Sequence, residues 1–150
     1  MTIPRFYHPA LPPHAKQVDL PPEAAHHAAK VLRLQAGDAV VLFDGTGGEY
    51  PAIISQIGRQ VRAVFGAWRE RECESPLDIT LVQAMSSGDK MDFTLQKAVE
   101  LGISAIQPVA SERSVVRLSG ERAEKRVRHW QQVVISACEQ CGRNRVPEVA

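Results

Sequence analysis

The change of pattern at residues 69–76 constrains the fold of this chain more than any other feature. The segment reads RERECESP, so it is charged, ends in proline and is typical of a linker between domains. Short strand-like runs broken by turns lie before it, and a strand–helix–strand pattern begins after it. A chain of 150 residues is long enough for two small domains. We therefore expect one domain in residues 1–72 and a second in residues 73–150.

The first domain is predicted to be a small β-barrel with one helix. The glycine-rich residues 45–48 predict a hairpin tip, because glycine adopts positive φ without steric cost. Pro21 and Pro22 predict the start of a helix whose apolar residues recur at helical spacing until about Gly37. Several short strands joined by tight turns favour a barrel. Strands are predicted at residues 3–7, 39–43, 50–57 and 61–68.

The second domain is predicted to be α/β. Strands at residues 77–84 and 103–109 alternate with helices at residues 90–101 and 119–141, which predicts parallel strands joined by a right-handed crossover. Residues 142–150 lead toward a further strand. Parallel strands need cover on both faces, and two strands with two helices supply little of it. We therefore expect the sequence to stop inside a domain.

The composition excludes several classes of protein. No apolar run approaches the roughly 20 residues that span a bilayer, and the first residues lack the apolar segment of a secretory signal. Three cysteines are an odd number and do not suit a disulfide scaffold. These features favour the cytoplasm.

No metal site is predicted. Cys138 and Cys141 form a C-x-x-C motif, but they close a predicted helix on its apolar side, where packing explains them. A redox pair is favoured at a helix N-terminus, and zinc requires four ligands. A redox or zinc protein is therefore kept only as an alternative interpretation of this motif. His26 and His27 are adjacent in a helix and point about 100° apart, so they cannot share a metal.

Positive charge is concentrated between Arg113 and Arg128. The net charge of the chain is only +1, but this segment holds six basic residues against two acidic ones. Positive charge at the start of a helix opposes the helix dipole, which favours a role in binding an anion. A solvated helix face explains the same charges equally well. The basic residues are Arg113, Arg117, Arg122, Lys125, Arg126 and Arg128.

Several motifs in a fixed order give the chain a resemblance to a known enzyme family. The second half reads QAM at 83–85, GDKMD at 88–92, QKAVELG at 96–102, ERSVV at 112–116, and EQ at 139–140 with GR at 142–143. The first half reads HH at 26–27, VLRL at 31–34, GD at 37–38, FDG at 43–45 and GEY at 48–50. Together these motifs resemble the RsmE type of 16S ribosomal RNA uridine N3-methyltransferase, in the SPOUT superfamily. They span nearly the whole chain.

The resemblance implies an α+β domain followed by an α/β domain: a PUA-like RNA-binding barrel and the first part of an α/β-knotted methyltransferase domain. It implies S-adenosylmethionine as methyl donor, a uridine N3 in 16S ribosomal RNA of the small subunit as acceptor, and a homodimer. The family's glycine-rich GPEGG stretch, which helps to form the cofactor pocket, would lie beyond Ala150. We therefore expect the cofactor-binding residues to lie outside this chain, and the chain alone to be inactive.

The expected chemistry nominates candidate site residues. Loss of the N3 proton leaves negative charge spread over O2 and O4 of uracil, which cationic or amide donors stabilise. The catalytic candidates are Lys90, Gln96 and Arg113. The expected RNA contacts are Arg5, Arg33, Arg122, Arg126 and Arg143, because a guanidinium donates two parallel hydrogen bonds to phosphate. No general base is identifiable. The alternative to an enzyme is a PUA-like RNA-binding module without catalytic activity.

Overall fold

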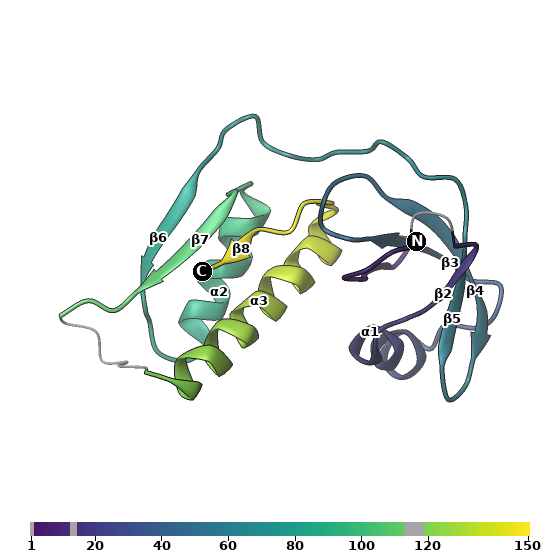
Figure 1. Ribbon diagram of the computed structural model, residues 1–150, viewed down its shortest axis with the longest axis horizontal. Coiled ribbons are helices and arrows are strands. Elements are labelled where there is room, and N and C mark those ends of the chain that lie inside the picture. Colours follow the sequence, from purple (N-terminus) through teal and green to yellow (C-terminus); the bar gives the residue numbers. More distant parts are fainter. Residues whose placement is uncertain (1, 13–14, 113–118) are drawn as a thin grey trace. The chain divides into compact units, whose positions relative to one another are not determined.

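The chain forms two compact units, unit 1 (Met1–Glu72) and unit 2 (Cys73–Ala150). The computed structural model describes residues 2–12, 15–112 and 119–150, drawn as a coloured ribbon in Figure 1. None of the helices in these ranges combines the length and the hydropathy that a membrane crossing demands.

Unit 1 is built on one five-stranded sheet. Its strands follow the order β1-β3-β4-β5-β2, so the sheet is an open, curled half-barrel with β1 and β2 at its two ends. β3, β4 and β5 form an antiparallel meander, as the turn pattern predicts. β1 runs parallel to β3, and β2 runs antiparallel to β5. The bounds are β1 Arg5–Tyr7, β2 Gln17–Asp19, β3 Ala39–Phe43, β4 Tyr50–Ile57 and β5 Val61–Phe65.

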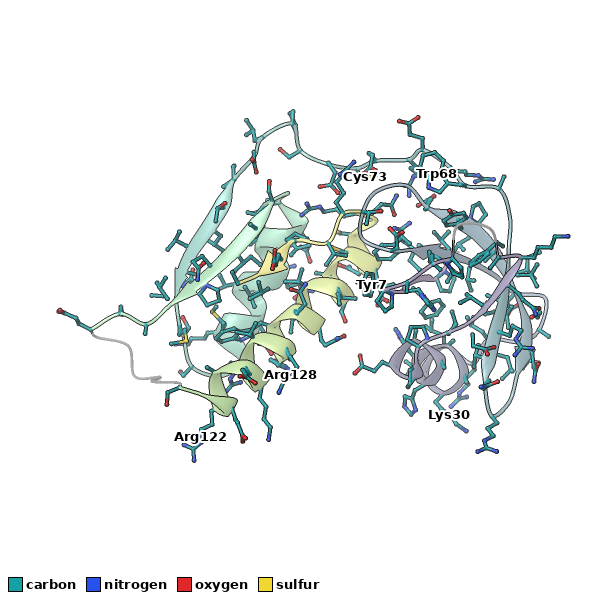
Figure 2. All side chains as sticks on the ribbon, viewed as in Figure 1. Tyr7, Lys30, Trp68, Cys73, Arg122 and Arg128 are labelled. Atoms are coloured by element: carbon teal, nitrogen blue, oxygen red, sulfur yellow. The ribbon has the colours of Figure 1, made fainter. Side chains whose placement is uncertain are left out.

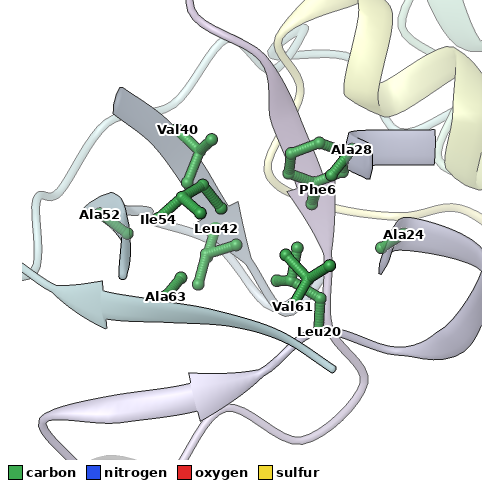
Figure 3. Packing of buried hydrophobic residues seen from close by; sticks show 10 residues of the cluster. All are labelled: Phe6, Leu20, Ala24, Ala28, Val40, Leu42, Ala52, Ile54, Val61 and Ala63. Atoms are coloured by element: carbon green, nitrogen blue, oxygen red, sulfur yellow. The ribbon is translucent and has the colours of Figure 1, made fainter. Parts of the chain in front are cut away.

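The core of unit 1 lies on one face of this sheet. Side chains alternate between the two faces of a strand, so neighbours in β4 have opposite surroundings. Ile54 is 0% exposed, whereas Ile53 is 53% exposed. Figure 3 shows the buried side chains converging from the strands and the helical segment. They are Phe6, Leu20, Ala24, Ala28, Val40, Leu42, Ala52, Ile54, Val61 and Ala63.

The helical segment of unit 1 is shorter and less regular than the sequence predicts. α1 (Pro22–His26) begins with proline and continues into a π-helix, η1 (His27–Val31). The wider turn is visible in the hydrogen bond from Leu32 N to the carbonyl oxygen of His27, at 2.9 Å. Arg33 then adopts φ 54° and ends the helix several residues before Gly37. A left-handed residue cannot continue a right-handed helix.

Positive φ angles at the hairpin tip between β3 and β4 confirm the predicted role of its glycines. Gly45, Gly47 and Gly48 have φ angles of 86°, 117° and 69°. Gly48 is also covered by the indole of Trp68, and a Cβ at this position would overlap the ring. Glycine is therefore required here both for the backbone and for the close approach of the aromatic side chain.

Unit 2 is a parallel three-stranded sheet with two helices. The strand order is β6-β7-β8, and both pairings are parallel, which confirms the strand–helix–strand prediction and the further strand expected after residue 142. Its register aligns Leu81, Ile106 and Val149 on the covered face, and α2 and α3 pack against each other. The bounds are β6 Thr80–Ala84, α2 Asp89–Glu100, β7 Ala105–Val109, α3 Glu121–Cys141 and β8 Glu148–Val149.

The other face of the parallel sheet carries exposed side chains. Val82 is 63% exposed, and Gln107, its partner in the register, is also exposed. Sheets of this kind in other proteins are usually covered on both faces.

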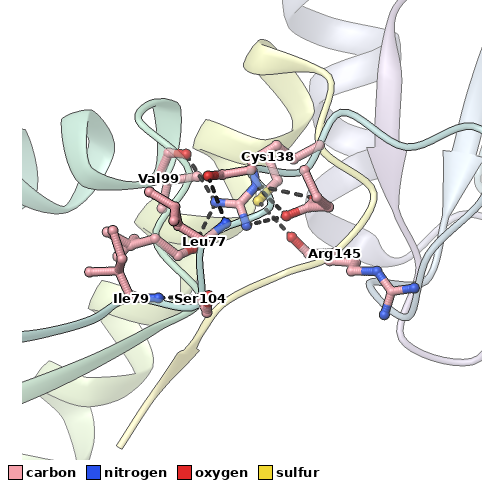
Figure 4. Close-up of polar contacts among 10 residues, drawn as sticks. Leu77, Ile79, Val99, Ser104, Cys138 and Arg145 are labelled. Atoms are coloured by element: carbon pink, nitrogen blue, oxygen red, sulfur yellow. Dashed lines mark hydrogen bonds and ion pairs between the residues drawn. The ribbon is translucent and has the colours of Figure 1, made fainter.

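A buried ion pair joins the beginning and the end of unit 2. After α3 the chain turns at Gly142, with φ 89°, and sends Arg143 into the interior, where the residue is 4% exposed. Nη1 of Arg143 donates to the carbonyl oxygens of Val99 and Ile103, at 3.0 and 2.9 Å, and Nε donates to the Glu74 carboxylate at 3.1 Å. Figure 4 shows polar contacts in this part of unit 2, with Val99, Cys138 and Arg145 labelled. The guanidinium thus binds one carbonyl oxygen in the last turn of α2 and one in the segment that follows this helix.

Burial alone would lower the pKa of Arg143, but the hydrogen bonds and the charge of Glu74 outweigh it and raise that pKa. Arg143 therefore stays charged inside the unit, and its charge is balanced by Glu74.

Candidate nucleic-acid interface

The N-terminal half of α3 presents a basic face. Arg122, Lys125, Arg126 and His129 recur at helical spacing and line a surface groove of about 350 Å³. Arg122 and Arg128 mark this half of the helix in Figure 2. Within the described ranges, no ion pair involves Arg122, Lys125 or Arg126, whereas Arg128 pairs with Glu124 at 3.7 Å. The groove therefore contains three positive side chains that form no ion pair with an acidic side chain of the described residues.

A second, less charged groove continues along α3 toward α2. It has a volume of about 280 Å³ and shares His129 with the first groove. Nε2 of His129 lies 2.8 Å from Oδ2 of Asp92, on α2. Because a carboxylate only accepts, this nitrogen carries the hydrogen. The lining residues are Gln96, His129, Gln132, Val133, Ser136 and Ala137.

The grooves bring together three of the eight residues that the sequence nominates. Gln96 lines the second groove, and Arg122 and Arg126 line the first. Lys90 is exposed in the first turn of α2 and lines neither groove. Arg113 lies outside the described residues, as does Arg117.

The three other nominated arginines have different surroundings. Arg33 is exposed at the end of the π-helix in unit 1. Arg5 is largely buried: its side chain is 8% exposed, pairs with Glu49 at 2.7 Å and lies over the ring of Phe43. Arg143 is 4% exposed, and its guanidinium binds Glu74 and the carbonyl oxygens of Val99 and Ile103 inside unit 2. These contacts give Arg143 a role in the fold, and its contact with RNA stays a prediction.

Lys125 belongs to the basic cluster that the sequence links to anion binding, whereas His129, Gln132 and Ser136 are not among the predicted site residues. The regular spacing of Arg122, Lys125, Arg126 and His129 on one helix face is the pattern that would have identified His129. His129 is further marked by its contact with Asp92, which is 37 positions away in the sequence and leaves no local pattern.

The two cysteines of the C-x-x-C motif, Cys138 and Cys141, lie partly or fully inside unit 2. Cys138 is buried, and its Sγ donates to the carbonyl oxygen of Arg145 at 3.7 Å, while Cys141 is partly buried and Cys73 is exposed. In the part of the chain that the structure describes, no group of three or more His, Cys, Asp or Glu side chains is arranged to hold a metal.

The grooves of unit 2 do not fit S-adenosylmethionine, the methyl donor that the resemblance implies. Three cationic side chains line one groove, and like charges would meet there if the positively charged sulfonium were bound. The second groove is shallow and open, and it offers no enclosed pocket for an adenine ring. Neither groove is assigned to the donor.

Comparison with known protein families matches both units. Residues 73–150 match the RNA methyltransferase domain, and residues 20–65 match the RNA methyltransferase PUA domain. Ribosomal RNA small subunit methyltransferase E of Buchnera aphidicola subsp. Schizaphis graminum is 34% identical over 148 residues, which are 98% of this chain and 60% of that protein. The chain thus spans about 60% of the length of this relative.

Solved structures show the same relationship. Ribosomal RNA small subunit methyltransferase E of Neisseria gonorrhoeae, bound to S-adenosyl methionine, matches with a TM-score of 0.93 and 50% identity, over 99% of this chain and 62% of that one. A Legionella pneumophila protein solved with bound SAM matches with a TM-score of 0.95 and 37% identity, over 100% of this chain and 62% of that one. The chain therefore belongs to the RsmE family of RNA methyltransferases, with the family's PUA domain matched in unit 1 and its methyltransferase domain matched in unit 2.

Proposed function

We propose that the protein to which this chain belongs methylates N3 of a uridine in 16S ribosomal RNA, with S-adenosylmethionine as methyl donor. The observation that carries this proposal is the match along 99% of the chain, at 50% identity, to the Neisseria gonorrhoeae enzyme solved with that cofactor. The small ribosomal subunit, or its RNA, is then the partner, and the cytoplasm is the compartment. We also propose that the active protein is a homodimer, as the family resemblance implies.

The proposed chemistry assigns roles to residues of unit 2. Uridine must lose its N3 proton, and the resulting negative charge spreads over O2 and O4. Lys90, Gln96 and Arg113 are proposed to donate hydrogen bonds or positive charge to these oxygens, which stabilises the anion. The target base must leave any stack or pair to expose its N3 edge. Support for Gln96 comes from its position in a groove that it lines together with His129 and Gln132.

Methylation at N3 has a specific test, because this atom lies on the pairing edge of uracil. The protein, expressed at the length of its relatives, is incubated with small subunits from cells that lack the activity, and the RNA is read by reverse transcription and by nucleoside mass spectrometry. We expect a new stop at one uridine and one added methyl group that co-elutes with N3-methyluridine. Methylation at carbon or at ribose would contradict the proposal. RNA binding without methyl transfer would support the non-catalytic module instead.

The chain of 150 residues alone is proposed to be inactive. This proposal is supported by the described grooves, which do not suit the donor, and by the expectation that the family's glycine-rich stretch of the cofactor pocket is not among residues 1–150. Titration calorimetry with S-adenosylmethionine should therefore show no saturable binding to residues 1–150, and clear binding to the longer protein. Tight binding to the 150-residue chain would disprove this proposal and leave the proposed reaction unaffected.

A further inference from the structure

The two grooves on α3 form one continuous surface whose character changes along the helix. His129 lines both, so the grooves meet at this side chain. From residue 122 to residue 136 the helix rises by roughly 21 Å, at about 1.5 Å per residue. One end of this surface is cationic, with Arg122, Lys125 and Arg126. The other end is largely apolar and carries the uncharged polar side chains of Gln96, Gln132 and Ser136.

The cationic end has the properties of a phosphate site. These three side chains have no ion-pair partner within the described ranges, and they lie in the first turns of α3, where the positive end of the helix dipole makes further cations unfavourable. A bound phosphate would remove this repulsion. Arginine and lysine on one helix face also allow contacts to more than one phosphate of a nucleic acid strand.

The neutral end has the properties of a site for a base or a ribose. Side-chain amides both donate and accept, as the edge of a pyrimidine requires, and the Ser136 hydroxyl does the same for a 2′-hydroxyl. Val133 and Ala137 add an apolar floor on which a ring can lie. His129, held by Asp92 at 2.8 Å, stands where the two ends meet.

We propose that the α2–α3 groove binds a single strand of RNA, with phosphates at Arg122, Lys125 and Arg126 and an unstacked nucleoside at Gln96, Gln132 and Ser136. This inference rests on the proposed function, because it identifies the surface of unit 2 that the RNA substrate occupies. It adds Lys125, Gln132 and Ser136 as binding residues and His129, oriented by Asp92, as a positioning residue.

The phosphate end is tested by the salt dependence of RNA binding. For single strands, the logarithm of the binding constant falls by about 0.7 for each phosphate contacted as the logarithm of salt concentration rises. With the 150-residue chain and a labelled oligouridine, Arg126→Gln should reduce this slope by about 0.7, and Arg122→Gln, Lys125→Gln and Arg126→Gln together should reduce it by about 2. Arg128→Gln is the matched control: it removes the same charge from the same helix, outside both grooves.

The nucleoside end is tested with neutral variants. Gln132→Ala should weaken oligouridine binding several-fold with the salt slope unchanged, because an amide contact releases no counterions. Gln140→Ala is its control: an exposed glutamine on the same helix that lines neither groove.

Several results would overturn the inference. Equal slope changes in Arg126→Gln and Arg128→Gln would show a diffuse charge effect and no groove. An absence of measurable oligouridine binding would exclude this surface as an RNA site. If Arg126→Gln leaves the salt slope of RNA binding unchanged but alters the oligomeric state measured by sedimentation, this face of α3 forms a contact between copies of the chain. Methyl transfer is measured in parallel with the same substitutions in the protein expressed at the length of its relatives. Normal methylation by a groove variant with an unchanged slope refutes the groove alone. Intact groove binding by that longer protein without N3 methylation refutes the proposed reaction alone.

Discussion

Replacement of Glu74 by alanine should destabilise unit 2 by about 3–5 kcal/mol, because it leaves the Arg143 guanidinium buried without its counter-charge. The side chains of Glu74 and Arg143 are only 19% and 5% exposed, so solvent screens the charge of the guanidinium poorly once the carboxylate is removed. Arg143 would still be held against the carbonyl oxygens of Val99 and Ile103, which cannot neutralise it. Urea unfolding followed by circular dichroism measures the change in the free energy of unfolding.

Glu124→Ala is the control for this prediction. It removes a carboxylate from the exposed Glu124–Arg128 pair, whose side chains are 69% and 66% exposed, and an exposed pair in a helix contributes only about 0.3–0.5 kcal/mol. A loss of stability in Glu74→Ala no larger than that in Glu124→Ala would show that the Arg143 network does not hold unit 2 together.

Ile54→Ala should destabilise unit 1 by about 2–5 kcal/mol, through lost burial and the cavity that remains. Ile54 is fully buried among the residues of Figure 3. Ile53→Ala is the matched control, since it makes the same chemical change one position away on the same strand, at a side chain that is 53% exposed. Its cost should stay near or below about 1 kcal/mol, the range of strand propensity.

The measurement is again the free energy of unfolding, for both variants in the same buffer. Similar losses in Ile53→Ala and Ile54→Ala would contradict the assignment of the two faces of β4. A large loss in Ile53→Ala alone would reverse that assignment.

Local patterns predicted most of the elements, because hydrophobic periodicity is a local property. β4 has the predicted bounds, 50–57, and α2 begins and ends within one residue of the predicted 90–101. β2 (Gln17–Asp19) was not predicted, since three residues are too few for a pattern and its hydrogen bonds go to β5, far along the chain. The π-helix was not predicted either, because the spacing of apolar residues does not distinguish it from an α-helix over a single turn.

The candidate site was less accessible to sequence reasoning. The count of charged residues predicts the basic cluster, but it does not show which of these side chains share one face of α3. Arg143 follows a helix end and looks like a surface arginine in the sequence. It is buried because Glu74, 69 positions earlier, lies beside it in the folded unit. The partner of a charged side chain depends on the tertiary structure, and composition alone does not reveal it.

Trp68, whose indole lies over Gly48, is useful for fluorescence spectroscopy because its exposure differs from that of the other tryptophan. The chain contains two tryptophans, one in each unit: Trp68 is 51% exposed, and Trp130, on α3, is 2% exposed. Their fluorescence should therefore differ, with a red-shifted, readily quenched emission from Trp68 and a blue-shifted, protected emission from Trp130. A Trp68→Phe variant would make the remaining tryptophan emission a reporter of unit 2 alone, so that the melting of this unit can be followed without a signal from unit 1.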